Sequence, residues 1–207
     1  MRIIFFTHVL FMYLLSCCIF TSCSKSLEFN EKNLSRNDTL FKEVVPGIKF
    51  TIKKGQHFSE QNIFQKIEIS HLKFKVKFDS TAVYKTILHE NQYDINKLYG
   101  FSDNNSNHHS YSARFGWRWS DNALHLFAYI YNEGKNDSKE ICIIPIGEEI
   151  NCSIKIEGND YVFTAGGYTE ILPRLSKTSK ARGYMLFPYF GGDEVAPQDL
   201  NIWIKND

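Results

Sequence analysis

Apolar and polar residues alternate with a period of two through most of the chain beyond Phe41, as in residues 48–53, 72–79 and 200–205. Successive side chains of a β-strand point to opposite faces, so each segment is expected to form a strand with one buried and one solvated face. Turn sequences rich in glycine, asparagine and aspartate separate these segments. Many short strands at this spacing predict an all-β fold, an antiparallel β-sandwich of two sheets.

Helical periodicity is almost absent from the same part of the chain. Only residues 59–66 offer a short helix, with Ser59 as a candidate N-cap. We therefore expect at most one or two short helices, and we expect the basic segment at residues 173–183 to be a solvated connection.

Three strands, at residues 112–119, 124–131 and 184–190, differ from the others because they lack a clearly wet face. Such an antiparallel strand is either covered by another segment or lines a binding surface. The lysine-rich strand at 72–79 already supplies a solvent face, so we place the three at the centre of a concave sheet. The alternative, which the sequence leaves open, is a loop such as residues 90–109 folded over them.

The N-terminal residues have the layout of a secretory signal peptide: Arg2, an apolar run over residues 3–20, and small residues directly before Cys23. A cysteine at the cleavage site is typical of lipoproteins, and two or more acyl chains hold a protein stably on a bilayer. We therefore expect a signal peptide over residues 1–22 and an exported lipoprotein anchored through Cys23 on the periplasmic or surface face of an outer membrane.

Two alternatives for this N-terminal segment stay open. Cys17 follows an apolar-apolar-small triplet that fits a lipobox better, although only Cys23 is followed by a polar stretch. The apolar run also nearly reaches the ~20 residues that span a bilayer, so an uncleaved signal anchor is the other alternative. In either case residues 23–40 are expected to be a flexible tether, and residues 41–207 the β-sandwich domain.

The charge of the mature chain is balanced. Arg2 is the only charged residue before Cys23, so cleavage leaves 23 of the 24 lysines and arginines against 23 aspartates and glutamates. Such a balance gives no attraction to nucleic acid, which we exclude as a partner.

Cys142 and Cys152 flank Gly147 at equal distances, which predicts a hairpin that sets the two cysteines opposite each other. A non-hydrogen-bonded pair brings the Cα atoms to ~4.5 Å, within the range of a disulfide. The alternative is two buried, reduced thiols. No further histidine or cysteine is spaced to make a metal site with them.

The common catalytic signatures are missing, including Gly-x-Ser-x-Gly, His-Glu-x-x-His, a phosphate loop and an EF-hand loop. A retaining glycosidase needs two carboxyl groups ~5 Å apart, and no strand here carries the alternating acidic residues that would supply them. We expect no cofactor. A structural calcium ion at residues 191–194 and Asp199 is a weaker alternative to an ordinary acidic turn.

Candidate ligand-binding residues are basic or aromatic. Aromatic rings stack on the apolar faces of sugars, and arginine binds carboxylates or sulfates bidentately. Arg114 and Arg118 are four residues apart on one strand, hence on one face about 13 Å apart, which suits two successive acidic groups of a chain-like ligand. The alternatives are ion pairs to Asp94 or Asp121, and a purely structural role for the histidine. The full set of candidates is Arg114, Arg118, Trp119, His125, Tyr129, Tyr131 and Tyr189.

Three strings of residues, DINKLYGFSD (94–103), SARFGWRW (112–119) and LFPYFGGDE (186–194), together resemble a group of uncharacterised exported lipoproteins of Gram-negative bacteria. The strand order is more loosely similar to concanavalin-like jelly rolls, including alginate-lyase-type domains. This looser resemblance implies a sandwich with a carbohydrate-handling concave face. The lyase strings Arg-x-Glu-x-Arg, Gln-Ile/Val-His and Tyr-x-Lys-x-Gly-x-Tyr are absent, so no lyase residue is carried over.

The sequence therefore predicts a membrane-tethered, non-catalytic module that binds a carbohydrate, with an acidic glycan as one candidate. One alternative is a polysaccharide lyase acting on uronates, in which Arg114 or Arg118 neutralises the carboxylate and His125 or Tyr129 moves the proton. The other is a structural envelope lipoprotein without a small ligand.

Overall fold

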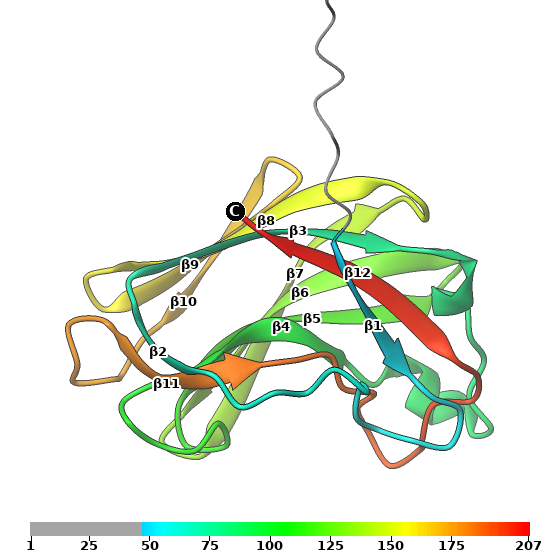
Figure 1. Ribbon diagram of the computed structural model, residues 1–207, viewed down its shortest axis with the longest axis horizontal. Helices are drawn as coiled ribbons and strands as arrows, with labels where there is room; N and C mark the ends of the chain where they lie inside the picture. The colour runs from blue at the N-terminus through cyan, green and yellow to red at the C-terminus, as the bar shows by residue number, and fades with distance from the viewer. Residues whose placement is uncertain (1–46) are drawn as a thin grey trace, which may run out of the picture. The chain divides into compact units, whose positions relative to one another are not determined.

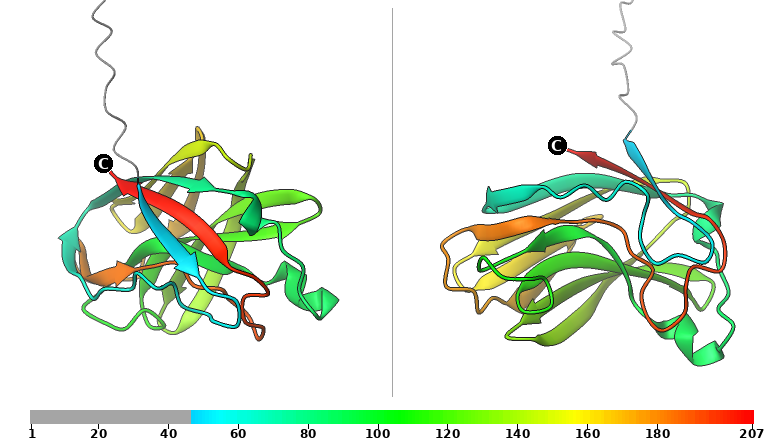
Figure 2. Two further views of the ribbon diagram at one scale, coloured as in Figure 1. Left: turned by 45° about the vertical axis from the view of Figure 1, so that its right-hand side comes forward. Right: turned by 60° about the horizontal axis from the view of Figure 1, so that its bottom comes forward.

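The structure, a computed structural model, describes residues 47–207, which form two antiparallel sheets of six strands each (Figure 1). Sheet A consists, in spatial order, of β1 (Ile48–Ile52), β12 (Leu200–Asn206), β3 (His71–Phe78), β8 (Glu149–Glu157), β9 (Asp160–Ala165) and β10 (Tyr168–Pro173). Sheet B consists of β2 (Lys66–Ile69), β11 (Ala181–Leu186), β4 (Asn96–Ser102), β5 (Ser112–Ser120), β6 (Ala123–Asn132) and β7 (Lys135–Ile144). The right-hand view of Figure 2 shows the sheets as two layers, with β1, β12 and β3 over β11 and β4. The predicted two-sheet sandwich is confirmed.

The core lies between the two sheets and is rich in aromatic rings. Phe74 on β3 packs edge-on against Phe115 on β5, with 5.5 Å between ring centroids, and Phe78 packs against Trp117 at 5.1 Å. These side chains are at most 1% exposed, as the alternating pattern predicts, while the lysines between them on β3 face outward. Burial of one such ring stabilises the fold by about 1.5–3 kcal/mol. Both sheets and this core lie within residues 48–206, so the described part has a complete core of its own.

Helices contribute little to the described residues, where two 3₁₀ turns occur: η1 (Ser80–Ala82) and η2 (His89–Tyr93). The predicted helix at 59–66 is wrong. The Ser59 amide donates to the Pro188 carbonyl at 3.2 Å and the Glu60 amide donates to the Thr51 carbonyl at 2.9 Å. Hydrogen bonds to distant segments thus replace the local bonds that a helix would need. Among residues 47–207, no helix is long and apolar enough to cross a bilayer.

The three strands expected at the centre of one sheet do lie in sheet B as β5, β6 and β11. The alternative of a covering loop at 90–109 holds only for its two ends, because the middle of this segment is β4, the strand that joins β5 to β11. Leu98 and Phe101 of β4 are at most 1% exposed, so burial of these side chains holds the segment in the sheet.

The predicted hairpin between Cys142 and Cys152 is also wrong. The chain passes from sheet B to sheet A near Gly147, so β7 pairs with β6 and β8 pairs with β3. Burial of the apolar side chains of β7 against sheet B and of β8 against sheet A stabilises the fold more than pairing of the two strands in a short hairpin would. In the structure both cysteines are free thiols, and burial raises the pKa of each.

The predicted signal peptide at 1–22, the lipidated Cys23 and the tether at 23–40 lie outside the described residues and remain predictions.

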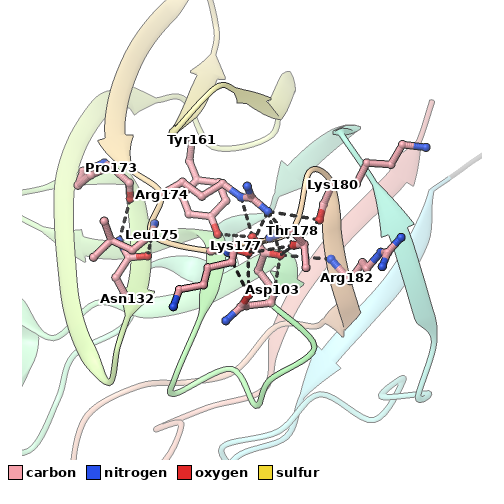
Figure 3. A network of polar contacts seen from close by, with 12 residues as sticks. Asp103, Asn132, Tyr161, Pro173, Arg174, Leu175, Lys177, Thr178, Lys180 and Arg182 are labelled. Atoms are coloured by element: carbon pink, nitrogen blue, oxygen red, sulfur yellow. Dashed lines mark hydrogen bonds and ion pairs between the residues drawn. The ribbon is translucent and has the colours of Figure 1, made fainter.

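A buried ion pair fastens one end of the sandwich (Figure 3). Arg174, which follows β10, donates from Nε to the Asp103 carboxylate at 2.8 Å, and the Tyr161 hydroxyl donates to the same carboxylate at 2.6 Å. The backbone amide of Arg182 on β11 also donates to Asp103, at 3.2 Å. Burial alone would raise the pKa of Asp103, but hydrogen bonds from Arg174 and Tyr161 outweigh it and hold that pKa below its ordinary value. The segment at 173–183, predicted to be a solvated connection, therefore begins with a buried anchor that links the two sheets.

We expect Asp103→Asn to lower the free energy of unfolding by about 3–5 kcal/mol at neutral pH, because it leaves the buried Arg174 charge without its partner. A carboxyl whose pKa is depressed on folding stabilises the protein above its unfolded pKa, and that stability is lost as the pH falls through its folded pKa. The loss on acidification below about pH 4 should thus be smaller in the variant than in the wild type.

Urea denaturation at neutral and acidic pH measures both effects. Glu68→Gln is the matched control, since it breaks an exposed pair with Arg182 worth at most about 1 kcal/mol. Equal effects of the two substitutions would contradict the structural role of Asp103.

Candidate functional site

A cleft of about 580 Å³ opens on the face of sheet B that points away from sheet A. Strands β4, β5, β6 and β11 form its floor, and the loops around residues 58–64, 108–109 and 187–192 form its walls. Its polar and aromatic lining consists of Phe58, Asn62, Phe64, Lys97, His108, His109, Arg114, Tyr129, Tyr131, Tyr184, Phe187 and Tyr189. None of its lining residues within the described chain is an aspartate or a glutamate.

Arg114 lies at the centre of the floor. It points outward because its neighbours on β5, Ala113 and Phe115, face the core. The side chain is only 7% exposed, yet its Nε has no hydrogen-bond partner, and the ion pairs of residues 47–207 do not include it. Its guanidinium carbon lies 5.6 Å from the centroid of the Tyr129 ring. Burial lowers the pKa of Arg114 to about 10, so the group stays charged at neutral pH.

Gly100, opposite Arg114 on β4, makes this arrangement sterically feasible. A Cβ atom at position 100 would overlap the Ala113 carbonyl and the Cα and Cβ atoms of Arg114. Only glycine lets the two strands approach this closely beside the arginine.

Lys97 on β4 adds a second cation. Its Nζ lies 4.4 Å from the centroid of the Tyr129 ring and contacts the Ile95 carbonyl. Burial and the charge of Arg114 lower the pKa of Lys97 to about 8. Two cations therefore share one tyrosine ring in a cleft that has no carboxylate in its lining.

Histidine and tyrosine hydroxyls complete the polar lining. His108 Nδ1 lies 3.0 Å from the Tyr184 hydroxyl, and burial, with Arg114 and His109, lowers the pKa of His108 to about 4. In the tautomer that carries its proton on Nε2, His108 Nδ1 accepts from the Tyr184 hydroxyl, which in turn accepts from the His108 backbone amide at 3.2 Å. Burial raises the pKa of Tyr129 to about 12, and its hydroxyl accepts from Asn136 at 3.0 Å.

Exposed aromatic rings surround the mouth of the cleft. Phe58 is 61% exposed and packs edge-on against Tyr189 at 4.9 Å, while Phe64 is 76% exposed and lies 5.6 Å from the ring of Tyr184. Ring faces at the rim of a polar cleft suit the apolar faces of sugar rings.

The structure brings four of the predicted site residues together in this cleft: Arg114, Tyr129, Tyr131 and Tyr189. The candidates on β5 and β6 lie on the same side of the sheet, since Arg114 is the cross-strand partner of Tyr129.

Three predicted site residues lie elsewhere. Arg118 is on the same face of β5, but its guanidinium donates to the Tyr93 carbonyl at 3.1 Å and to Ser120 Oγ at 3.2 Å. Trp119 points to the opposite face of β5 from Arg114 and packs against the core, so it is not placed to stack on a ligand in the cleft. His125 contacts Glu140 Oε1 at 2.8 Å and the Ser120 carbonyl at 3.2 Å, which matches the structural alternative.

Lys97, His108, Tyr184 and the two rim phenylalanines are not among the candidates predicted above. His108 lies six residues before Arg114, whereas the others come from strands or loops remote in sequence from it, and no local pattern indicates that they meet. For Arg114, the alternative of an ion pair to Asp94 or Asp121 does not occur among the described residues.

The carboxylates considered above for a calcium ion, in residues 191–194 and at Asp199, accept hydrogen bonds from the protein backbone. Glu194 accepts from the backbone amides of Ile87 and Leu88 at 2.8 Å each, and Asp199 accepts from the Lys54 amide at 2.9 Å. Within residues 47–207, no group of three or more His, Cys, Asp or Glu side chains is placed to hold a metal ion. These carboxylates fix loops.

The fold is that of concanavalin-like jelly rolls. Similar structures include the alginate lyase AlyC3, with a TM-score of 0.51 and 9% identity over 78% of this chain and 74% of that one. The catalytic domain of an endo-1,3-beta-glucanase (laminarinase) from Thermotoga petrophila has a TM-score of 0.50 and 11% identity over 77% and 75% of the two chains. The Crh5 transglycosylase has a TM-score of 0.50 and 8% identity over 76% and 70%. At these identities the likeness establishes the fold alone. No protein-family model and no curated protein matches the sequence.

We expect the Lys97 amino group to react with amine-selective acylating reagents already near pH 8, because about half of it is neutral at a pKa of about 8. Arg114→Met removes a neighbouring positive charge, so the pKa of Lys97 should rise and its labelling at pH 8 should slow. Mass spectrometry of the labelled peptides measures the rate, with exposed Lys139 as the internal reference. Labelling that is unchanged or faster in the variant would contradict the proximity of the two cations.

Proposed function

We propose that this protein binds an acidic glycan in the cleft on sheet B, without catalysing a reaction on it. Arg114 carries this proposal. A buried cation without a hydrogen-bonding partner is costly, and native structures rarely leave one unsatisfied. A carboxylate or sulfate of a ligand would supply the missing acceptors in a charge-assisted hydrogen bond.

The rest of the cleft supports the same ligand class. Lys97 gives a second positive charge, and none of the described lining residues is itself an aspartate or a glutamate, although the Asp94 carboxylate acts on Lys97 from beside the cleft. Tyr129, Tyr131, Tyr184 and Tyr189 offer rings and hydroxyls for the apolar faces and hydroxyl groups of sugars. A volume of about 580 Å³ lies within the usual range for small-ligand sites. The shared fold of a lyase and a laminarinase is consistent with a carbohydrate ligand.

A non-catalytic role is favoured by the pKa values of two candidate acid–base groups of the cleft, His108 and Tyr129. Acid–base catalysts work best with a pKa near the operating pH, whereas the pKa of His108 is lowered to about 4 and that of Tyr129 is raised to about 12. The cleft also lacks, among its described residues, the paired carboxyl groups of a retaining glycosidase.

Export and membrane anchorage through Cys23 belong to the same proposal. The N-terminal sequence supports them, and an anchored module would hold its glycan at the cell envelope.

A second candidate function, a lyase acting on uronates, is favoured by Lys97. Its pKa of about 8 leaves a fraction neutral at physiological pH, beside the Arg114 that would neutralise a uronate carboxylate. Lys97 takes the place of His125, one of the two acid–base residues predicted from sequence, because His125 is held outside the cleft by Glu140 and Ser120, whereas Tyr129 lines the cleft. Incubation of residues 41–207 with alginate, pectin and glycosaminoglycans, followed by absorbance of the unsaturated product, tests it. Product formation that Lys97→Met abolishes would establish the lyase and overturn the non-catalytic role.

A glycan array with residues 41–207 should show binding to carboxylated or sulfated oligosaccharides and none to their neutral counterparts. We expect Arg114→Met to weaken the best ligand roughly 10- to 100-fold, the range of one charge-assisted hydrogen bond. Arg118→Met is the matched control on the same strand and face, and it should change the dissociation constant at most severalfold because its guanidinium is already hydrogen-bonded to the protein.

Isothermal titration calorimetry gives both constants, and thermal melting verifies that the variants fold. Binding of neutral glycans with equal affinity, or equal losses in both variants, would contradict an Arg114-centred anion site.

A further inference from the structure

The outward face of sheet A, on the other side of the sandwich from the cleft, segregates positive charge. Strands β1, β12 and β3 are adjacent in that order, and their outward positions carry five lysines: Lys49, Lys73, Lys75, Lys77 and Lys205. We call these residues, together with Trp203, the lysine face. The outward positions of the three strands, all within the described residues, hold no aspartate or glutamate.

Four of these five lysines form no ion pair within residues 47–207, although Asp199 interacts electrostatically with Lys49 and Asp207 with Lys75. The fifth, Lys75, pairs with Glu149 of the neighbouring strand β8 at 3.0 Å. Like charges on adjacent strands repel one another. Since the mature chain has equal numbers of basic and acidic residues, this segregation on one face is a feature of the fold and not of the composition.

Trp203 lies in the middle of the lysine face. It is the cross-strand partner of both Lys49 and Lys77, whose Nζ atoms lie 5.5 Å and 5.3 Å from the centroid of its ring. A partly exposed indole surrounded by ammonium groups is suited to the headgroup layer of a bilayer, where tryptophan concentrates and where anionic lipids attract lysine.

The position of the lysine face in the chain fits such a surface. β1 is the first strand of the described fold, and its first residue, Ile48, pairs with Ile204, directly beside Trp203 and Lys205. Figure 1 shows β1 and β12 side by side with the C-terminus at the end of β12. An N-terminal membrane anchor would therefore enter the sandwich at the edge of this face, and the anchor and the face would reinforce each other's binding.

We propose that the lysine face docks on the anionic phosphate headgroups of a bilayer, with Trp203 at headgroup level. Docking in this way turns the cleft on sheet B, which faces the opposite side of the sandwich, away from the membrane and toward its ligand. The docking surface stands independently of the glycan site, because the two share no residue.

Co-sedimentation of residues 41–207, which lack the proposed lipid anchor, with vesicles tests the docking surface. Binding is expected to vesicles of phosphatidylcholine mixed with phosphatidylglycerol, to weaken with added salt, and to be far weaker with phosphatidylcholine alone. The triple variant Lys49→Gln, Lys77→Gln, Lys205→Gln should partition roughly 100-fold less into the anionic vesicles. The charge-matched control Lys66→Gln, Lys135→Gln, Lys177→Gln removes exposed lysines from elsewhere and should bind as the wild type does.

Tryptophan fluorescence supplies a second measurement. Trp117 is fully buried and Trp119 packs against the core, so a blue shift on addition of anionic vesicles reports on Trp203 and should vanish in Trp203→Phe. Arg114→Met should bind vesicles normally, which separates failure of docking from failure of the glycan site.

Three results would overturn the proposal: equal losses in the lysine-face variant and the charge-matched control, equal binding to neutral and anionic vesicles, or loss of glycan binding in place of vesicle binding in the lysine-face variant.

Discussion

The buried pair of Asp103 and Arg174 holds together the end of the sandwich on which the cleft depends. It joins the end of β4 to the segment after β10, and Tyr161 of β9 and the backbone of β11 meet at the same carboxylate. The amide of Asp103 also donates to the Tyr111 carbonyl, which closes the loop that carries His108 over the cleft. Because a carboxylate with this many donors is satisfied only in one arrangement, the pair fixes the geometry of that wall.

Two buried arginines differ in how fully their guanidinium groups are hydrogen-bonded. Arg174 is 3% exposed and its Nη2 donates to Ser176 at 3.0 Å and to Thr178 at 3.1 Å, in addition to its ion pair with Asp103. Arg114 is 7% exposed and faces tyrosine rings, with its Nε unsatisfied. The two guanidinium groups are buried to a similar extent, but Arg174 has hydrogen-bond partners within the protein and Arg114 Nε has none. That contrast is the physical reason for the proposal that Arg114 binds a ligand.

The strands could be predicted from the sequence because burial imposes a period of two wherever one face of a sheet is packed. Arg114, Tyr129 and Tyr131 could likewise be placed on strands without a wet face, which is where the cleft lies. The hairpin predicted at Gly147 is wrong, since a local symmetry in sequence cannot reveal that the chain changes sheets. Trp119 could not be placed on the buried face from sequence alone, because the opposing sheet decides which face of a strand is buried, here through the contact of Phe78 with Trp117. Lys97 and Tyr184 could not be predicted for a similar reason: only the folded chain brings these residues of β4 and β11 to Arg114.

Gly100 has a consequence for how variation in such a protein should be interpreted. It does not line the cleft, yet the close approach of β4 and β5 beside the guanidinium exists only while position 100 lacks a side chain. Replacement of Gly100 by alanine adds only one methyl group, yet it would push β4 and β5 apart and displace Arg114. The residues on which the proposed binding depends therefore include one that lies beneath the floor of the cleft and outside its lining.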